Sequence, residues 1–336
     1  MKTLKFIAIL FFMSFVACKN QKGEKMEDQV LKPDTTYTIE TAKNYAELSI
    51  KEGGYWEGRE YIGGTFKNVT ELKVPAAHTD HSWYIRYEGP GWESNKVGYR
   101  LYLDWRNCID IFGKVTDSII LPKVGQDGFD SYHEKSDWGQ DILKAGKGLG
   151  IGAIGRYVNK EVLHFNDVDS TFAKVENTIN KSTVTVNYYG WETLNDKTDF
   201  SSVLTITPNQ RYTKHTIKTS KEMEGICTGI VKHGVNYFTK ESTNKKWGYI
   251  ATYGIQTLAA EPDNLGMAIL YEIATVSEVT EWEHDHLIVF KPSTKEISFY
   301  FLGAWEQEKD GVKTETDFLS YLDEKLQELN DTNVLK

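Results

Sequence analysis

The sequence has few cysteines and prolines, and it has no long apolar run after its first 18 residues. Three cysteines with no CxxC pair argue against a cysteine-rich zinc site. No later stretch approaches the 18 apolar residues of a membrane span. The net charge of −9 argues against broad nucleic-acid binding, which requires a basic face. With 40% hydrophobic and 26% charged residues, the chain is predicted to be globular, with a sizeable core.

The first segment is typical of an export signal. In residues 1–18, Lys2 and Lys5 precede a short apolar run that ends at Cys18. This arrangement resembles the lipobox of bacterial lipoproteins, in which the cysteine carries the lipid and the anchor includes no transmembrane helix. Ordinary secretion is the alternative. Residues 19–46 are predicted to be a polar tether, and the lack of an acidic run after the cysteine favours the periplasmic face over the cell surface.

Residues 47–336 are predicted to form one β-rich domain. The chain has 27 glycines and 13% aromatic residues, and no βα unit repeats along it. Short segments rich in Thr, Val, Ile and Tyr are separated by turn signals. The clearest predicted strands are 97–104, 182–189, 202–207, 212–219 and 296–302. The fold class that follows is all-β, a large antiparallel β-sandwich of the supersandwich kind with a C-terminal helix.

Two helices are expected. Thr314 and Asp317 have the spacing of a helix N-terminus, and apolar residues then recur at helical spacing up to residue 329. This helix is predicted to cover a sheet. A second, short helix is predicted over residues 137–143.

Residues 150–155 match the GxGxxG dinucleotide fingerprint, but their context does not. The fingerprint requires a helix after the glycines, whereas strand-like residues 156–158 follow here. A glycine-rich turn or a tight sheet crossing is predicted instead. Cys108 and Cys227 remain once Cys18 is set aside. They form either a disulfide, as an oxidising compartment allows, or two buried thiols.

Three of the six arginines lie within the 21 residues 86–106, among tryptophans and carboxylates. Arginine binds carboxylate or sulfate groups through two parallel hydrogen bonds, and flat aromatic rings can stack on sugar rings. The predicted substrate-binding residues are Arg86, Arg100, Arg106, Trp92, Glu93 and Tyr102. The alternative is that the arginines pair with nearby carboxylates and only hold a sheet together.

Side chains alternate between the two faces of the predicted strand 97–104, and this indicates which of these residues lie together. It places Arg100, Tyr102 and Asp104 on one face of the strand. The opposite face, which would end at Trp105, is predicted to belong to the core.

The sequence Tyr132-His133-Glu134 offers the groups for general acid–base chemistry. His133 is predicted to act as base or acid, with Tyr132 as its counterpart and Glu134 or Asp137 orienting the imidazole. His81 is the second candidate base. The alternative is a polar turn that caps a following helix.

Two histidine pairs have weak metal-ligand character. In a strand, His284 and His286 point to one face and could bind a divalent metal, which would be the only cofactor expected. His78 and His81, three positions apart with Asp80 between them, could also bind a metal. Neither pair completes a zinc motif.

Four segments resemble an exported lipoprotein family of polysaccharide-degrading marine bacteria that includes ulvan oligosaccharide dehydratases. They are WYIRYEGPGWESNKVGYRLYLDWRN, DIFGK, GQDGFDSYHEKSDWG and EWEHDHLIVF. The match covers roughly residues 50–305. It implies an acidic, sulfated algal oligosaccharide as partner. It also implies removal of water from a non-reducing-end glucuronic or iduronic acid, which leaves a 4,5-unsaturated uronyl end.

Such an elimination requires a positive group that neutralises the carboxylate, a base for the C5 proton and an acid for the departing hydroxide. Three other functions remain open at this stage. A polysaccharide lyase would use similar residues but expel a sugar. A glycoside hydrolase would need two carboxylates, for which Glu88 and Glu93 are candidates. A glycan-binding lipoprotein would need no catalytic groups.

Overall fold

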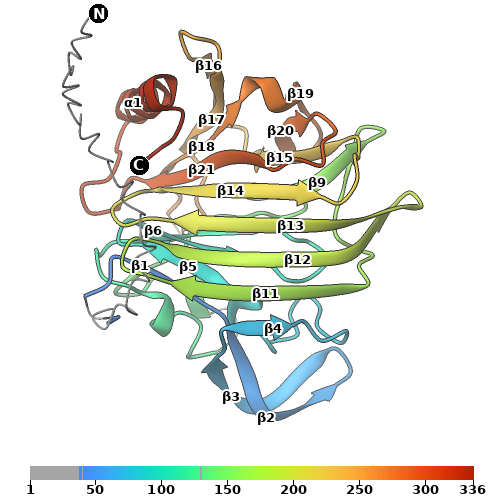
Figure 1. The fold of residues 1–336 in the computed structure, drawn as a ribbon. Coiled ribbons are helices and arrows are strands. Elements are labelled where there is room, and N and C mark those ends of the chain that lie inside the picture. The colour runs from blue at the N-terminus through green and yellow to red at the C-terminus, as the bar shows by residue number, and fades with distance from the viewer. Residues whose placement is uncertain (1–37, 40, 129–130, 260) are drawn as a thin grey trace, which may run out of the picture. The chain divides into compact units, whose positions relative to one another are not determined.

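The computed structural model describes residues 38–39, 41–128, 131–259 and 261–336. The predicted signal segment with Cys18 lies outside this part of the chain, as does most of the predicted tether. Within the described residues, all paired strands run antiparallel, in three sheets and a separate hairpin, and a single α-helix follows the last strand (Figure 1). The predicted all-β sandwich with a C-terminal helix is confirmed.

The largest sheet has nine strands, in the order β16-β17-β18-β21-β14-β13-β12-β11-β4, and it forms the front layer in Figure 1. Its strands are β4 (Glu71–Lys73), β11 (Ser170–Asn177), β12 (Ser182–Thr193), β13 (Asp196–Ile206), β14 (Tyr212–Thr219), β16 (Asn236–Glu241), β17 (Trp247–Ile255), β18 (Asn264–Glu272) and β21 (Ile297–Trp305). The predicted strand 212–219 is β14 with the same bounds, and the other predicted segments fall in or overlap β6, β12, β13 and β21.

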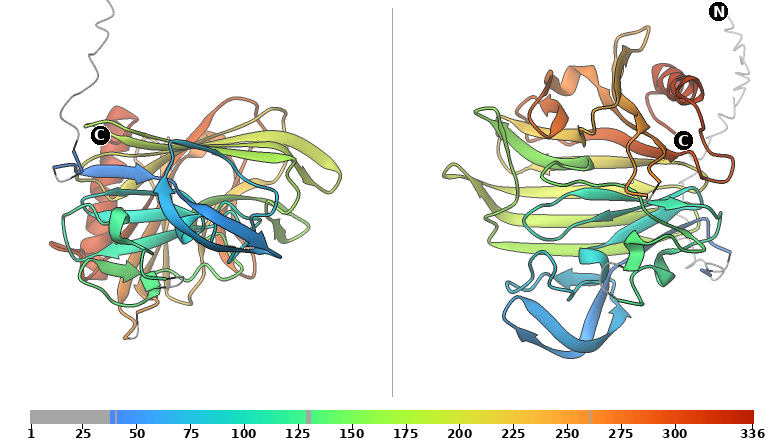
Figure 2. Two further views of the ribbon diagram at one scale, coloured as in Figure 1. Left: turned by 90° about the horizontal axis from the view of Figure 1, so that it is seen from below. Right: turned by 180° about the vertical axis from the view of Figure 1, so that it is seen from behind.

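Two five-stranded sheets lie side by side and form the second layer, which faces the viewer in the right panel of Figure 2. One is β1 (Asn44–Glu47), β5 (Gly91–Ser94), β6 (Val97–Leu101), β7 (Ile109–Lys114) and β8 (Gly139–Asp141). The other is β10 (Glu161–Leu163), β9 (Ile151–Val158), β15 (Ile226–Val231), β20 (Asp285–Phe290) and β19 (Val276–Glu281). β1 includes the last three residues of the predicted tether.

The main hydrophobic core fills the space between the layers. Large aromatic side chains cross it and end in polar contacts on the opposite layer. The Trp92 indole in β5 donates a 2.8 Å hydrogen bond to Thr213 Oγ1 in β14. The Tyr99 hydroxyl in β6 accepts a 2.9 Å bond from the Gly303 backbone N–H in β21. Burying such a side chain contributes roughly 1.5–3 kcal/mol, and the polar ends fix the alignment of the layers.

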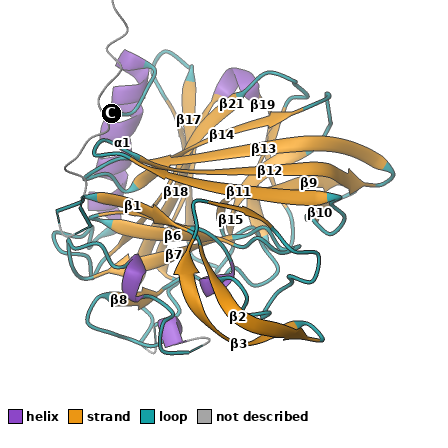
Figure 3. Cartoon of the chain, turned by 60° about the horizontal axis from the view of Figure 1, so that its bottom comes forward, coloured by secondary structure: helices purple, strands orange, loops and turns teal. Residues whose placement is uncertain are grey.

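The hairpin of β2 (Ser49–Glu57) and β3 (Glu60–Asn68) projects from one end of the sandwich (Figure 3). Trp56 and Tyr61 pack their rings on Tyr84, with centroids 5.0–5.3 Å apart. This contact ties the hairpin to the loop before β5. The described residues also include four short 3₁₀ turns: η1 (Arg86–Glu88), η2 (Leu121–Lys123), η3 (Ser131–His133) and η4 (Ile273–Thr275).

The C-terminal helix α1 (Glu315–Thr332) covers the outer face of the nine-stranded sheet over β17 and β18. Its N-cap is Thr314, whose hydroxyl accepts a 3.1 Å hydrogen bond from the Asp317 backbone N–H, as predicted. Its buried side chains are Phe318, Leu322, Leu326 and Leu329. In the described part of the chain, no helix is long and apolar enough to cross a membrane.

The predicted helix over 137–143 is wrong. Residues 139–141 form β8, which pairs with β7 at the edge of the sheet. Gly139 has a φ of 130°, and a Cβ there would lie 1.9 Å from the Gly113 carbonyl oxygen. This close backbone approach requires glycine and favours the strand over the helix.

The glycine motif at 150–155 enters β9, as the sheet-crossing interpretation requires. Gly152 has a φ of 70°, and a Cβ there would lie 2.2 Å from the ring of Phe301 in the opposite layer. Cys108 and Cys227 are both free and buried. Of the two alternatives from the sequence, the structure shows the buried thiols.

His215 is a buried polar link between the two layers. Its Nε2 lies 2.5 Å from Ser202 Oγ, and its Nδ1 lies 2.9 Å from the Gly152 carbonyl oxygen. Burial lowers the pKa of this imidazole from 6.5 to about 4. Because the unfolded chain binds the proton more tightly, the stability from His215 is fully present above pH 6.5. It is lost as the pH falls through about 4.

We therefore expect the free energy of unfolding to fall by about 3 kcal/mol across this pH window through His215 alone. The variant His215→Gln lacks the titration, so its unfolding free energy should change by about 3 kcal/mol less over the same window. Urea unfolding of both proteins at a series of pH values measures the difference. Other titrating groups are common to the two proteins. Parallel pH profiles would contradict this assignment.

Candidate functional site

The segment between the hairpin and β7 has an unusual backbone. Five residues other than glycine have positive φ here: His81 (58°), Trp83 (51°), Tyr87 (42°), Glu88 (71°) and Asn107 (47°). Such conformations cost about 1–3 kcal/mol each where the surroundings must enforce them, and they concentrate at functional sites. The strain therefore directs attention to the side chains that this segment carries.

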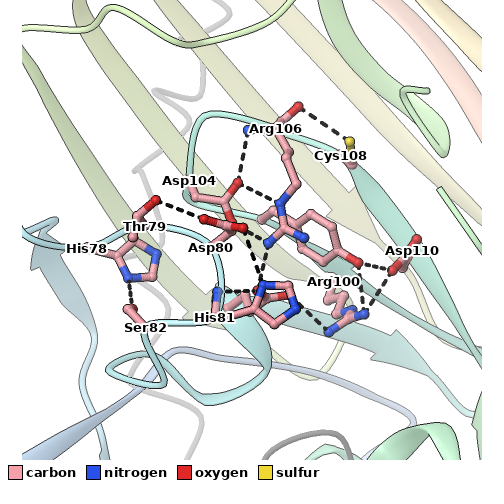
Figure 4. Close-up of polar contacts among 12 residues, drawn as sticks. His78, Thr79, Asp80, His81, Ser82, Arg100, Asp104, Arg106, Cys108 and Asp110 are labelled. Carbon is pink, nitrogen blue, oxygen red and sulfur yellow. Dashed lines mark hydrogen bonds and ion pairs between the residues drawn. The ribbon is translucent and has the colours of Figure 1, made fainter. Parts of the chain in front are cut away.

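Glu88 lies at the centre of a charge cluster on this segment. Its Oε1 accepts a 2.6 Å hydrogen bond from Arg106. Arg106 also binds Asp104 at 2.5 Å, a contact drawn in Figure 4. The Glu88 side chain is almost completely buried. Burial alone would raise the pKa of this carboxyl, but the guanidinium groups of Arg100 and Arg106 hold it below its usual value. Glu88 is therefore ionised in the folded protein at neutral pH.

Arg100 joins this cluster to the end of β8. Its guanidinium donates to Asp110 at 2.8 Å and to Asp141 at 2.7 Å, and lies 3.7 Å from Glu88. The Tyr102 hydroxyl donates to Asp110 and accepts a 2.9 Å bond from Arg100. The Arg100 side chain is only 1% exposed. Arg100 therefore holds the carboxylates of the site in place and has no exposed surface that a ligand could contact.

His81 stands at one end of this network. Its Nδ1 lies 3.4 Å from Asp80 and 3.9 Å from Glu88, and its backbone N–H donates to Glu88 at 3.0 Å (Figure 4). The imidazole is 51% exposed. With two carboxylates beside it and half of its surface open, the His81 imidazole is placed to accept a proton from a ligand.

His133 stands at the other end. Its Nδ1 lies 3.4 Å from Asp141, and its side chain is 40% exposed. Its ring lies against Tyr132, whose ring in turn lies 4.6 Å from the Arg100 guanidinium. Burial raises the pKa of Tyr132 to about 12. Tyr132 thus stays neutral, and Arg100 connects the two histidines through Glu88 on one side and Asp141 on the other.

His133 also lines a cleft of about 770 Å³. Residues 258–259, 261–263 and 306–307 form the opposite wall, and the cleft is large enough for a saccharide unit. Its charged lining is mostly acidic, with Glu134, Glu261, Asp263 and Glu306 against Lys135.

One protein-family model spans every residue of this site. A family model described as a domain of unknown function, DUF4861, covers residues 14–333. The chain belongs to this family. No curated protein matches it.

The structure of this DUF4861 protein removes three predicted residues from the substrate surface. Arg86 is buried in an ion pair with Glu47, which also accepts from the Tyr87 hydroxyl. Trp92 lies in the core between the layers. Glu93 is buried, binding Lys114 at 2.5 Å and accepting from the Ile120 and Leu121 backbone N–H groups. Since Glu93 and Glu88 bind separate partners, they do not form the carboxylate pair considered for a hydrolase.

The predicted orienting residues are also displaced. Glu134 and Asp137 are exposed, and Asp137 lies 3.9 Å from Lys123 rather than beside an imidazole. Asp141 contacts His133 instead. Burial raises the pKa of the Asp141 carboxyl well above its usual range, against the opposing effect of Arg100. Of the other predicted residues, the structure brings together Arg100, Arg106, Tyr102, Tyr132, His133 and His81.

The proposed metal pair does not converge. His286 stacks on Tyr237 with centroids 4.2 Å apart, whereas His284 packs against Trp282. Only Asp285 between them belongs to a buried network, with hydrogen bonds from the Leu149 N–H and the Trp282 indole. Among the described residues, no three His, Cys, Asp or Glu side chains are grouped to hold a metal ion.

Sequence reasoning missed Asp110 and Asp141, and it misplaced Trp105. The two aspartates lie 10 and 41 positions from Arg100, so no local spacing links them to it. Trp105 is 42% exposed, because β6 ends at Leu101 and the strand alternation ends with it.

Proposed function

We propose that this protein is a carbon–oxygen lyase that removes water from the non-reducing-end uronic acid of acidic algal oligosaccharides such as those from ulvan. One observation carries the proposal. Two half-exposed imidazoles, His81 and His133, each lie against a carboxylate at the two ends of one buried network around Arg100. The resemblance of segments 83–107 and 125–139 to ulvan oligosaccharide dehydratases supports the same chemistry.

In this mechanism, His81 is the base. Its neutral imidazole accepts the C5 proton, and Asp80 and Glu88 stabilise the imidazolium that forms. The electron pair of the C5–H bond becomes the C4–C5 double bond. The C4–O bond breaks, and protonated His133 donates its proton so that the hydroxyl departs as water. A positioned acid or base of this kind accelerates a reaction by about 10²–10⁴-fold.

The carboxylate on C5 must be neutralised for its neighbouring proton to become acidic. Arg106 is the guanidinium of the network nearest to solvent, with its side chain 15% exposed, and it lies beside Glu88. We assign it to the substrate carboxylate. Arg100 has a different role, because its side chain is closed off by Asp110, Asp141 and the ring of Tyr102.

Incubation with oligosaccharides that end in a saturated uronic acid tests the proposal. We expect absorbance of the unsaturated uronyl group to rise in the near ultraviolet, while each chain loses the mass of one water and keeps its length. A rise in absorbance with shortening would indicate a polysaccharide lyase. Binding without any change in mass would indicate a glycan-binding protein. Either result would contradict the dehydratase.

A glycoside hydrolase is the second candidate, and the acidic lining of the cleft beside His133 favours it. Glu134, Glu261 and Glu306 all line this cleft. Shortened saccharides without ultraviolet absorbance would select this function.

A further inference from the structure

A second cleft, of about 280 Å³, is lined by basic residues. It lies between the loop 144–148, the end of β15 and the turn before β20. Its charged or titratable side chains are Lys144, Lys147, Lys232, His233, His284 and Glu283. Three lysines against one carboxylate make this a local positive region in a chain of net charge −9. A cleft concentrates the field of its charges and attracts the opposite charge.

Two of these lysines have no carboxylate partner among the described residues. Lys144 and Lys147 are exposed, and neither takes part in an ion pair within the described segments. Lys232 differs, because its ammonium binds Glu281 at 3.2 Å and the Trp282 carbonyl oxygen at 3.0 Å. The positive charge of Lys232 is therefore neutralised within the protein, whereas the charges of Lys144 and Lys147 are not.

His233 adds an unused polar atom to the lining. Its Nε2 is buried and has no hydrogen-bond partner in the part of the chain that the structure describes. A buried nitrogen without a partner costs free energy, and this imidazole lies beside the backbone of Lys144.

The loop that carries Lys144 and Lys147 is held in place from both sides. Ala145 packs against Tyr102 and Cys108, and the Cys108 thiol donates to the Gly148 carbonyl oxygen at 2.9 Å. The Leu149 backbone N–H donates to Asp285 in β20 at 2.9 Å. Since Tyr102 contacts Arg100, the cleft shares its wall with the candidate active site. A preorganised loop loses little entropy when it binds a ligand.

An exposed aromatic ring lies close to the same loop. Trp105 packs its edge on His164 with centroids 6.0 Å apart, and His164 Nδ1 lies 2.8 Å from the Arg106 carbonyl oxygen. The backbone of Lys147 lies near the same imidazole. Trp105 is the chain neighbour of Arg106, and the imidazole on which it packs adjoins the lysine loop, so a saccharide that spans both could contact its ring.

We propose that the cleft at Lys144 and Lys147 is an oxyanion subsite for a second charged unit of an anionic oligosaccharide, with Trp105 beneath the intervening sugar ring. The bound group is a sulfate ester or a carboxylate, since both present oxygens that accept hydrogen bonds from ammonium groups. The subsite rests on the proposed function only for the saccharide nature of its ligand. It does not depend on the elimination.

Titration calorimetry with ulvan oligosaccharides tests the subsite. We expect the double variant Lys144→Gln/Lys147→Gln to bind at least about ten-fold more weakly than the wild type, because two charge-assisted contacts are lost. Binding by the double variant should also be less sensitive to salt. The matched control is Lys181→Gln, an exposed lysine before β12 that has no ion pair among the described residues. We expect it to bind as the wild type does.

Chemically modified ligands separate the two sources of the oxyanion. If desulfation alone abolishes the difference between wild type and double variant, the subsite holds a sulfate ester. If carboxyl reduction alone does so, it holds a carboxylate. Equal affinities of wild type and double variant, equal losses in Lys181→Gln, or no binding by the wild type would each overturn the subsite. Weaker binding by the double variant together with no unsaturated product would retain the subsite and reject the elimination.

Discussion

Replacing Arg100 with methionine is expected to lower the free energy of unfolding by about 3–5 kcal/mol. The guanidinium is fully buried and pairs with Asp110 and Asp141 while lying close to Glu88. Its removal leaves three carboxylates in a region from which water is excluded, and their mutual repulsion is no longer compensated. Urea unfolding followed by tryptophan fluorescence measures the loss.

Arg59→Met is the matched control for this experiment. Arg59 is largely exposed and lies 3.6 Å from Asp80, so its replacement should cost less than about 1 kcal/mol. Arg100→Lys should lie between the two, since an ammonium keeps the charge but cannot bind two aspartates as a planar fork does. If Arg100→Met were as stable as Arg59→Met, the network would not hold the site together.

Replacing His81 with glutamine is expected to lower kcat for the unsaturated product by about 10²–10⁴-fold, with little change in KM. The imidazole accepts the C5 proton in the proposed mechanism, and an amide cannot do so. Because half of the side chain is exposed, the free energy of unfolding should change by less than about 0.5 kcal/mol. Steady-state kinetics and urea unfolding of the same preparation separate loss of catalysis from loss of structure.

His133→Gln should reduce kcat in the same range, as the acid in the same step. The double variant should lose much less than the product of the two single losses, because groups that act in one step are not additive. Lys181→Gln again serves as the control and should keep the wild-type rate. A His81→Gln protein that still forms unsaturated product within a few-fold of the wild-type rate would refute the assignment of the base.

Local signals in the sequence predicted much of the fold. Thr314 with Asp317 marked the start of α1, and a short segment rich in Thr, Ile and Tyr marked β14. These features depend on residues that are neighbours along the chain. The prediction of a helix over 137–143 was wrong because the conformation there does not depend on residues that are neighbours along the chain. That conformation is fixed by pairing with β7, which lies more than 20 residues earlier.

The candidate site was predictable only in part, because its contacts join distant residues. The charge-rich segment 86–106 did contain Arg100 and Arg106, and the second candidate base, His81, lies shortly before it. Sequence alternation could not show that β5 is buried on both faces, which is why Trp92 and Glu93 looked like surface residues. The carboxylates that pair with Arg100 come from β7 and the end of β8, and only the folded sheet brings them together.

The strand order of the largest sheet determines how much of the chain must be synthesised before that sheet can close. β21, the last strand in the sequence, lies inside that sheet, between β18 and β14. Until residue 305 has left the ribosome, the strands on its two sides cannot join, and each side presents an unpaired edge that could pair with another chain. Closure of this sheet must therefore follow synthesis of nearly the whole polypeptide. A chain that ended before this strand would be two open half-sheets prone to aggregation.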